Sequence, residues 1–231
     1  MTNPPYMLAH VKRVAEILKH PQVFEFLHVP VQSGSDEVLH GMVREYTVGD
    51  FDLMVKGLKE GCPNITIATD IICGFPGETE ENHKESIDLV KRHHFPILNI
   101  SQFYPRPNTP AARMPKLNSK IVKARSQETT ALFDSYRTFD SMIGLENGRN
   151  AEIPSSETRT AADGDFTQLV WFHAHEDHRS TGQRHTVGHT KNHTKIIVKR
   201  DERLLEDIVP RLVRLERATK WHVEGTVVED F

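Results

Sequence analysis

Cysteine is scarce in this sequence, because Cys62 and Cys73 are the only two among its 231 residues. Two cysteines are too few for a framework of disulfides or for a metal site built from four thiolates. Neither has a second cysteine at the spacing of a metal-binding motif. We therefore expect both to be small buried residues, and we predict no metal ligand in this chain.

Long apolar runs are also absent, and neither sign of charge dominates. No stretch approaches the roughly 18 consecutive apolar residues that a membrane span requires, and the first residues lack the apolar core of a secretion signal. These absences favour a cytoplasmic protein without a membrane segment. The net charge of −3 gives no general attraction to a polyanion, so contact with nucleic acid would have to come from a local patch.

The hydrophobic and charged contents, 37% and 26%, are typical of a folded chain. Three short apolar stretches predict β-strands at residues 26–31, 65–72 and 97–104. Helices are predicted at residues 6–19, from residue 36, from Thr47 to Gly61, from Thr79 to about His94, and from residue 121 to Gly144. Thr47 and Asp50 form a capping-box pattern, and Thr79 is placed as an N-cap. Strands that alternate with helices predict an α/β fold with a parallel sheet.

The residues after Gly144 follow a different pattern. Their apolar pieces are short, at residues 169–172, 196–198 and 221–228, and polar stretches separate them. This pattern predicts a small, mostly β domain, with a flexible connection over residues 152–165. We therefore expect one domain over residues 1–143 and a second over residues 144–231.

Polar and glycine-rich loops follow the predicted strands, where the active groups of parallel α/β sheets lie. Gly74, Pro76 and Gly77 allow a tight turn close to a ligand, and Glu78 could accept hydrogen bonds from ribose hydroxyls or an amine. Each candidate also has a plainer explanation. The loop at residues 74–78 could be a simple connector between a strand and a helix, Ser35 could only cap a helix, and Arg106 could be a solvated surface side chain. The candidate ligand-binding residues are Gln32, Ser33, Gly34, Ser35, Gly74, Gly77, Glu78 and Arg106.

The predicted β domain contains a basic tract between His178 and Arg200, with six Lys or Arg residues and no Asp or Glu. Such a tract could follow a phosphate backbone, and a solvated strand face is the alternative. Trp221 could stack on a base, although a core position is favoured. His173, His175 and His178 invite a zinc interpretation, but exposed polar histidines are favoured. The candidate RNA-binding residues are Arg179, Arg184, His189, Lys191, Lys195, Lys199, Arg200, Lys220 and Trp221.

Five ordered segments resemble the radical S-adenosylmethionine methylthiotransferases. They are TNPPY at 2–6, FLHVPVQSGSDEVL at 26–39, REY at 44–46, DIICGFPGETEE at 70–81, and QFYPRPNTPAARM at 102–114. Two further segments, VGHTKNHTKIIV at 187–198 and ATKWHVEG at 218–225, are similar to the C-terminal TRAM domain of one subgroup. That subgroup is the threonylcarbamoyladenosine tRNA methylthiotransferases of eukaryotes and archaea.

The resemblance implies half of a TIM-like radical S-adenosylmethionine barrel, made of three βα units, followed by a TRAM-like RNA-binding domain. It implies S-adenosylmethionine as a cofactor beside the loops at residues 32–35 and 74–78, and 4Fe-4S clusters in the full-length family. The implied reaction adds a methylthio group to threonylcarbamoyladenosine next to the anticodon. The implied partner is therefore tRNA, bound through its anticodon stem-loop.

The sequence also departs from the family pattern. It has no CxxxCxxC motif, which holds the radical cluster in the family, and TNPPY stands at its start rather than inside the barrel domain. We therefore expect a truncated fragment that is inactive alone and exposes a sheet edge. Asn108 replaces a glycine, and Glu206 with Asp207 replaces a glycine-containing turn. The alternatives are a non-catalytic tRNA-binding remnant and an unrelated TIM-like enzyme that binds another nucleotide.

Overall fold

The computed structural model describes residues 2, 4–145, 159–162, 164–177 and 182–228. The chain divides into two compact units. The first, called the α/β unit below, comprises Met1–His20 and Phe26–Asp134, and the second, called the β unit, comprises Pro21–Glu25 and Ser135–Phe231. Among the described residues, no helix has the length and apolar character needed to cross a membrane.

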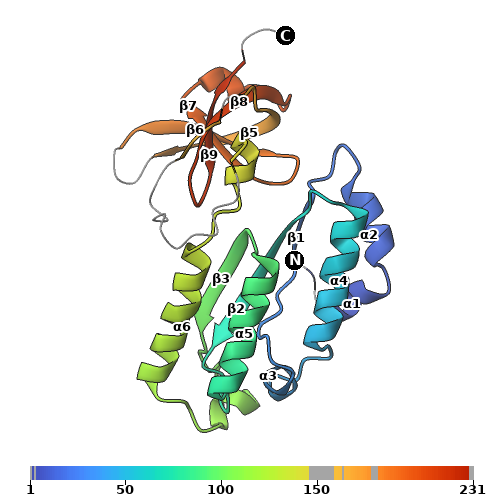
Figure 1. Ribbon diagram of the computed structural model, residues 1–231, viewed down its shortest axis with the longest axis vertical. Helices are drawn as coiled ribbons and strands as arrows, with labels where there is room; N and C mark the ends of the chain where they lie inside the picture. The colour runs from blue at the N-terminus through green and yellow to red at the C-terminus, as the bar shows by residue number, and fades with distance from the viewer. Residues whose placement is uncertain (1, 3, 146–158, 163, 178–181, 229–231) are drawn as a thin grey trace. The chain divides into compact units, whose positions relative to one another are not determined.

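The α/β unit contains a parallel sheet of three strands in the order β1 (Phe26–His28), β2 (Thr66–Cys73) and β3 (Ile97–Gln102). This arrangement confirms the predicted parallel sheet. Figure 1 shows the longer helices on one face of the sheet. The helices are α1 (Pro4–Leu8), α2 (Val11–Leu18), α3 (Asp36–Gly41), α4 (Val48–Gly61), α5 (Glu80–His93) and α6 (Ser119–Asp134), and a short 3₁₀-helix, η1, spans Pro110–Arg113.

Side-chain caps set where the two helices beside the sheet begin. The Thr47 hydroxyl accepts the backbone N–H of Asp50, whose carboxylate accepts the N–H of Thr47, so the predicted capping box of α4 is confirmed. Thr79 caps α5 in the same reciprocal way, with Asn82 as its partner. These caps satisfy backbone donors that the first helical turn leaves without partners.

Three predicted elements differ from the structure. The helix expected at residues 6–19 is two helices, α1 and α2, separated by a turn in which the His10 N–H donates to Met7 O. Strand β1 ends at His28, two residues before Pro30, which has no N–H for a strand ladder. Helix α6 ends at Asp134 rather than near Gly144. Beyond it, Tyr136 and Phe139 are buried within the β unit.

The β unit is a small barrel. Its strands are β4 (Arg159–Thr160), β5 (Thr167–Asp177), β6 (Arg184–Thr190), β7 (Lys195–Lys199), β8 (Arg211–Ala218) and β9 (Val223–Val227). Strands β5, β6, β7, β9 and β8 pair in that order, and β8 returns to pair with β5, which closes the ring. The β7–β9 pair is parallel and the others are antiparallel, as in the five-stranded OB fold.

The barrel core confirms the predicted apolar stretches of the tail. Val170, Phe172, Ile196 and Val198 lie in one buried cluster. The expected connection at residues 152–165 falls mostly outside the described residues, but its end includes β4, which pairs with β8. Glu206 and Asp207 stand where the family pattern has a glycine-containing turn. Here the Asp207 carboxylate accepts a hydrogen bond from the Val209 N–H.

Candidate functional site

The carboxyl ends of β1 and β2 are joined directly at the predicted Gln32 loop. Gln32 forms a parallel bridge with Ile71, in which its N–H donates to Asp70 O at 2.9 Å and its carbonyl accepts the Ile72 N–H at 2.9 Å. Gln32 has a φ of 72° and is buried. The Phe103 N–H donates to Cys73 O at 2.8 Å, so the end of β3 lies beside that of β2. The loops at residues 32–35 and 74–78 therefore follow adjacent strand ends.

The side chains of the first loop bind helix α5. The Gly34 N–H donates to Ser86 Oγ at 2.8 Å, and Ser33 Oγ lies 3.3 Å from the same oxygen. Asn82 Nδ2 donates to Ser35 Oγ at 3.0 Å. A Cβ on Gly34 would lie 2.5 Å from Ser86 Cα. Gly34 is therefore required by the close approach of α5, and these polar groups fix the loop to that helix.

The second loop is held by a buried ion pair that the sequence did not reveal. Glu78 Oε2 accepts hydrogen bonds from the Gly74 N–H at 2.8 Å and from Arg125 Nη1 of α6 at 2.7 Å. Both side chains are buried, with 2% and 7% of their surfaces exposed. Arg125 also donates to the carbonyl oxygen of Glu78. Glu78 thus ties the turn to α6, which differs from its expected contact with a ribose or an amine.

The two glycines of this loop have different surroundings. Both have positive φ, 83° at Gly74 and 89° at Gly77, as a tight turn requires. A Cβ on Gly74 would lie 2.5 Å from Val122 of α6, whereas a Cβ on Gly77 would meet nothing within 4 Å. Of the predicted loop residues, Gly77 borders open space and Gly74 packs on α6.

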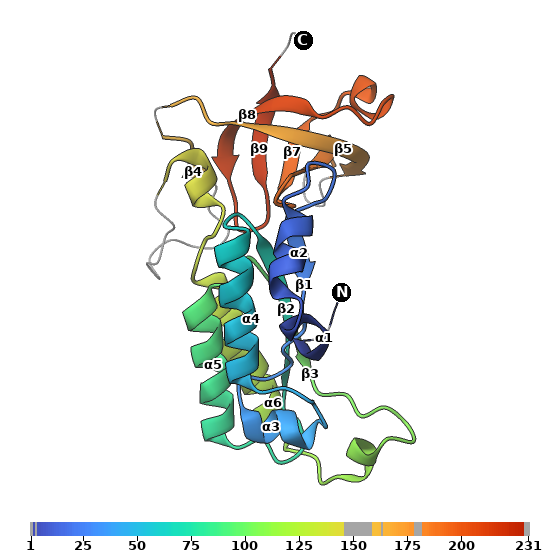
Figure 2. The same ribbon diagram turned by 90° about the vertical axis from the view of Figure 1, so that its right-hand side faces the viewer.

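A hollow of about 280 Å³ opens beside the ends of β2 and β3. Ile72, Phe75, Phe103 and Met114 contribute to its lining, and the two phenylalanine rings meet edge to face at 5.2 Å. The segment after β3 that carries η1 extends from this end of the sheet (Figure 2). Apolar walls of this kind suit the flat face of a nucleobase or another apolar group.

The predicted Arg106 lies in the same proline-rich segment. Its side chain is exposed, and its carbonyl accepts the hydroxyl of Thr109 at 2.7 Å. Asn108 has a φ of 65°, so asparagine takes the left-handed conformation expected where the family has glycine.

The sequence did not predict a polar triad that lies on the face of the sheet away from the helices. Asp70 Oδ1 is 2.7 Å from His28 Nε2 and accepts a hydrogen bond from Asn99 Nδ2 at 2.8 Å. In β2, Thr69 and Ile71 are buried and successive side chains alternate, so Asp70 points away from the helices. The signal was a charged residue inside an apolar strand. The triad places a carboxylate, an imidazole and an amide together on this face, where all three are at least partly exposed.

The two cysteines are buried, as predicted, and each is 1% exposed. Burial raises the pKa of Cys73 to about 11, and its sulfur lies 3.7 Å from Thr129 Oγ1. Among the described residues, no three His, Cys, Asp or Glu side chains are grouped so that they could hold a metal ion. These residues do not fit an iron–sulfur cluster, which is held by several cysteine thiolates.

In the β unit, carboxylates from neighbouring segments accompany most of the basic tract. Ion pairs join Arg184 to Asp177 at 2.9 Å and Lys195 to Glu176 at 2.5 Å. Lys191 lies near Glu25, and Arg200 pairs with Glu202. Three of these acids lie just outside the stretch that contains none and Glu25 lies far from it in sequence, so the charge excess is smaller in space than in sequence. Arg179 lies outside the described residues.

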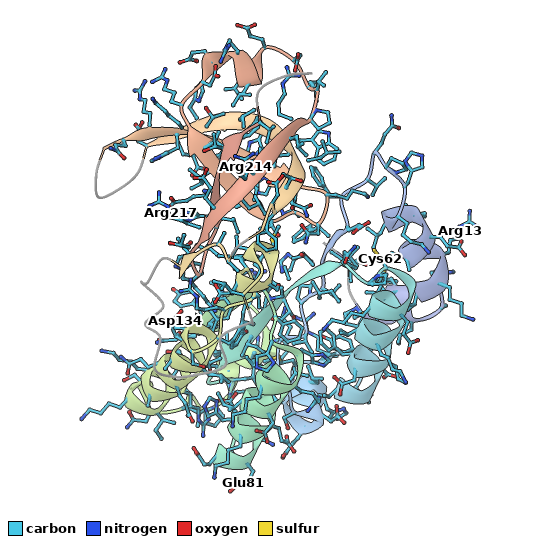
Figure 3. All side chains as sticks on the ribbon, turned by 45° about the horizontal axis from the view of Figure 1, so that its top comes forward. Arg13, Cys62, Glu81, Asp134, Arg214 and Arg217 are labelled. Atoms are coloured by element: carbon cyan, nitrogen blue, oxygen red, sulfur yellow. The ribbon has the colours of Figure 1, made fainter. Side chains whose placement is uncertain are left out.

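A groove of about 510 Å³ on the barrel nevertheless gathers basic residues. Arg184, Lys199, Arg200 and Arg217 line it, together with the carboxylates of Glu216 and Glu224. Arg217, labelled in Figure 3, pairs with Glu224. The Lys199 side chain is exposed at the end of β7. The groove therefore brings Lys199 together with three arginines, each of which also pairs with a carboxylate.

Lys220 and Trp221 occupy opposite environments. Lys220 is buried, donates to Tyr136 O at 2.7 Å, and lies 4.2 Å from the centre of the Tyr136 ring. This position makes it an internal contact rather than part of an RNA-binding surface. Trp221 is 61% exposed, so the preference for a core position is wrong.

Two of the three histidines considered for zinc, His173 and His175, contact different partners in the described structure. His175 Nε2 lies 2.8 Å from Glu202 Oε2, and its Nδ1 lies 3.1 Å from the Thr186 hydroxyl. His173 lies against His189, with 2.9 Å between Nε2 and Nδ1. His178 falls outside the described residues.

Sequence comparison identifies close relatives of one kind. The chain is 42% identical over 230 residues to a threonylcarbamoyladenosine tRNA methylthiotransferase of Drosophila melanogaster, which is 100% of this chain and 37% of that protein. A Danio rerio protein of the same name is 57% identical over 144 residues, which is 62% of this chain and 26% of that protein. A probable enzyme of this name from Pyrococcus horikoshii is 42% identical over 127 residues, 55% of this chain and 30% of that protein. No family model matches the chain.

Substitution of the two loop glycines should separate packing from backbone strain. Gly34→Ala should destabilise the chain by about 1 to 3 kcal/mol, because its Cβ meets the backbone of α5. Gly77→Ala should cost about 1 kcal/mol, because only its positive φ opposes the change. Urea unfolding measures both variants. Equal stability of the two would contradict the close contact at Gly34.

The cysteines should resist thiol reagents in the folded chain. With a pKa of about 11, Cys73 holds little thiolate at pH 8, and burial blocks access to both sulfurs. A chromogenic disulfide reagent should therefore label neither residue at pH 8 and both residues in guanidinium chloride. Rapid labelling of Cys73 in the native chain would contradict its burial and its raised pKa.

Proposed function

We propose, because the chain belongs to the family of threonylcarbamoyladenosine tRNA methylthiotransferases, that it is the C-terminal portion of an enzyme that adds a methylthio group to threonylcarbamoyladenosine in tRNA. The observation that carries this proposal is 42% identity over the whole chain to a relative of that name. The chain spans 37% of that relative's length. The activity is therefore proposed for the whole enzyme, to which this chain would contribute the two units described above.

The α/β unit is proposed as half of a TIM-like radical S-adenosylmethionine barrel. Its three parallel strands and adjacent strand-end loops support this assignment. S-adenosylmethionine and 4Fe-4S clusters would supply the radical chemistry in the full enzyme. Gly77 and the hollow beside Phe75 and Phe103 would border the adenosyl group, and the triad around Asp70 would face the interior of the barrel. The cluster ligands would come from other polypeptide.

The β unit is proposed as a TRAM-like domain that binds the anticodon stem-loop of tRNA, in the cytoplasm. The closed five-stranded barrel supports this, because barrels of this order commonly bind oligonucleotides. The basic groove beside Lys199 and the exposed Trp221 supply a phosphate site and a stacking ring. A non-catalytic tRNA-binding protein is the alternative, and the two buried thiols favour it for this chain on its own.

Mass spectrometry of tRNA nucleosides tests the activity. In cells that lack the gene and have no second copy of the family, the methylthio form of threonylcarbamoyladenosine should disappear and the unmodified form should accumulate. Restoring the gene should restore the methylthio form. An unchanged level in the deletion strain would overturn the enzymatic proposal and leave the non-catalytic alternative.

Binding of tRNA to the purified chain should depend steeply on salt, because phosphate contacts release counterions. Lys199→Ala should weaken binding and lower the slope of log affinity against log salt by about 1. Lys12→Ala, which removes an exposed charge from the α/β unit, is the matched control and should leave the slope unchanged. Filter binding at several salt concentrations measures this, and salt-independent affinity would contradict a phosphate site.

A further inference from the structure

One face of β6 and β7 presents a row of side chains to the outside of the barrel. The register places His185 opposite Lys199, and His189 opposite Lys195. The alternate residues of β7, Ile196 and Val198, belong to the buried core. Because side chains alternate along a strand, the histidines and lysines of these pairs share the outward face.

At one end of this row, histidine rings form a flat surface. The His173 and His189 rings are nearly parallel, at 10°, and Nε2 of one lies 2.9 Å from Nδ1 of the other. This geometry sets the two rings side by side in a hydrogen-bonded pair. The His189 ring also stacks on His193, with centroids 4.3 Å apart at 17°. The His193 ring thus supports the His173–His189 pair from one side. His173 is exposed, so the pair reaches the solvent at that residue.

Two further aromatic side chains support the stack. Phe24 meets the ring of His193 edge to face at 5.4 Å and the ring of Trp171 at 6.0 Å. Phe24 reaches this position because the Glu25 N–H donates to Lys191 O at 2.8 Å. Five rings from three segments of the chain therefore meet at the surface of the β unit.

Two of these histidines, His189 and His193, have a pKa below the ordinary value for histidine, which favours the neutral ring in a stack. Burial is the largest of the effects that lower the pKa of His189 to about 4; the nearby His193, His173 and Lys195 act in the same direction, and Glu176 opposes them. Burial also lowers the pKa of His193. Neutral imidazoles can hold the donor–acceptor pair between His173 and His189, which two protonated rings would break.

Lysines continue from the rings along the same face, and the first of them, Lys195, also pairs with Glu176. Lys195 lies opposite His189, and Lys199 follows two outward positions later beside the basic groove. A flat aromatic surface followed by a row of cations matches what single-stranded nucleic acid requires, namely stacking for a base and cations for its phosphates. A metal ion fits less well, because the facing nitrogens of His173 and His189 already bond each other.

We propose that this face binds an unpaired segment of RNA, with one base stacked on the His173–His189 pair and the adjoining phosphates on Lys195 and Lys199. The inference rests on the proposed function and deepens it, since it places the unpaired loop of the tRNA on named residues of the barrel. Base stacking gives little sequence preference, so the platform would hold the loop without selecting the base.

Fluorescence anisotropy of a labelled eight-residue oligouridine with the full chain tests the platform. His173→Ala should weaken binding about 5- to 150-fold, the range expected for loss of one stacked base. His173→Phe, which keeps a flat ring and removes the hydrogen bond, should stay within about threefold of the parent chain. His40→Ala, which removes an exposed histidine from α3, is the control and should have no effect. Unchanged thermal melts would show that each variant is folded.

The outcomes separate the two proposals. If the parent chain binds tRNA with the expected salt slope and His173→Ala binds oligouridine as tightly as the parent, the stacking platform is overturned and the tRNA-binding role stands. If the parent binds neither RNA, both fail. If His173→Phe loses as much affinity as His173→Ala, the imidazole itself is needed and the stacking platform is overturned. If a chelator abolishes binding, a metal ion is needed and the platform is overturned as well.

Discussion

The buried ion pair between Glu78 and Arg125 fixes the geometry of the α/β unit at the end where its strands finish. One carboxylate oxygen holds both the Gly74 N–H, just past β2, and the guanidinium of α6. The pair therefore connects a turn to a helix 47 residues away in sequence. Removing one partner would leave a charge buried in an apolar setting, which is far more costly than losing a surface ion pair.

This constraint explains how the strand-end loops are built. Residues 33–35 are fixed to α5 through Ser86 and Asn82, and Gly74 is fixed to α6 through Glu78 and Val122. Most polar groups of these loops are therefore used inside the protein. A ligand at this edge would meet backbone, the open surface at Gly77 and the apolar hollow, in which shape matters more than side-chain charge.

The sequence predicted features that depend on neighbours along the chain. The caps at Thr47 and Thr79, the parallel sheet and the buried cysteines are confirmed. The predicted end of α6, near Gly144, was wrong. Tyr136 and Phe139 continue the helical spacing of apolar residues, but they pack in the β unit.

Features that depend on distant partners were not predictable in the same way. The role of Glu78 is set by Arg125 on another helix, and the carboxylates that neutralise the basic tract lie just beyond its ends or on residues 21–25. The triad of His28, Asp70 and Asn99 needs three strands in register before its members meet. No local pattern contains this information, because each contact joins residues separated by tens of positions.

A double-mutant cycle on Glu78→Gln and Arg125→Met tests the central constraint most directly. Each single substitution should lower the free energy of unfolding by about 3 to 5 kcal/mol, because each leaves a buried polar group without its charged partner. The double substitution should cost no more than either single one, since it removes both charges together. Costs that add to within about 0.5 kcal/mol would show that the two residues act independently and would contradict the account.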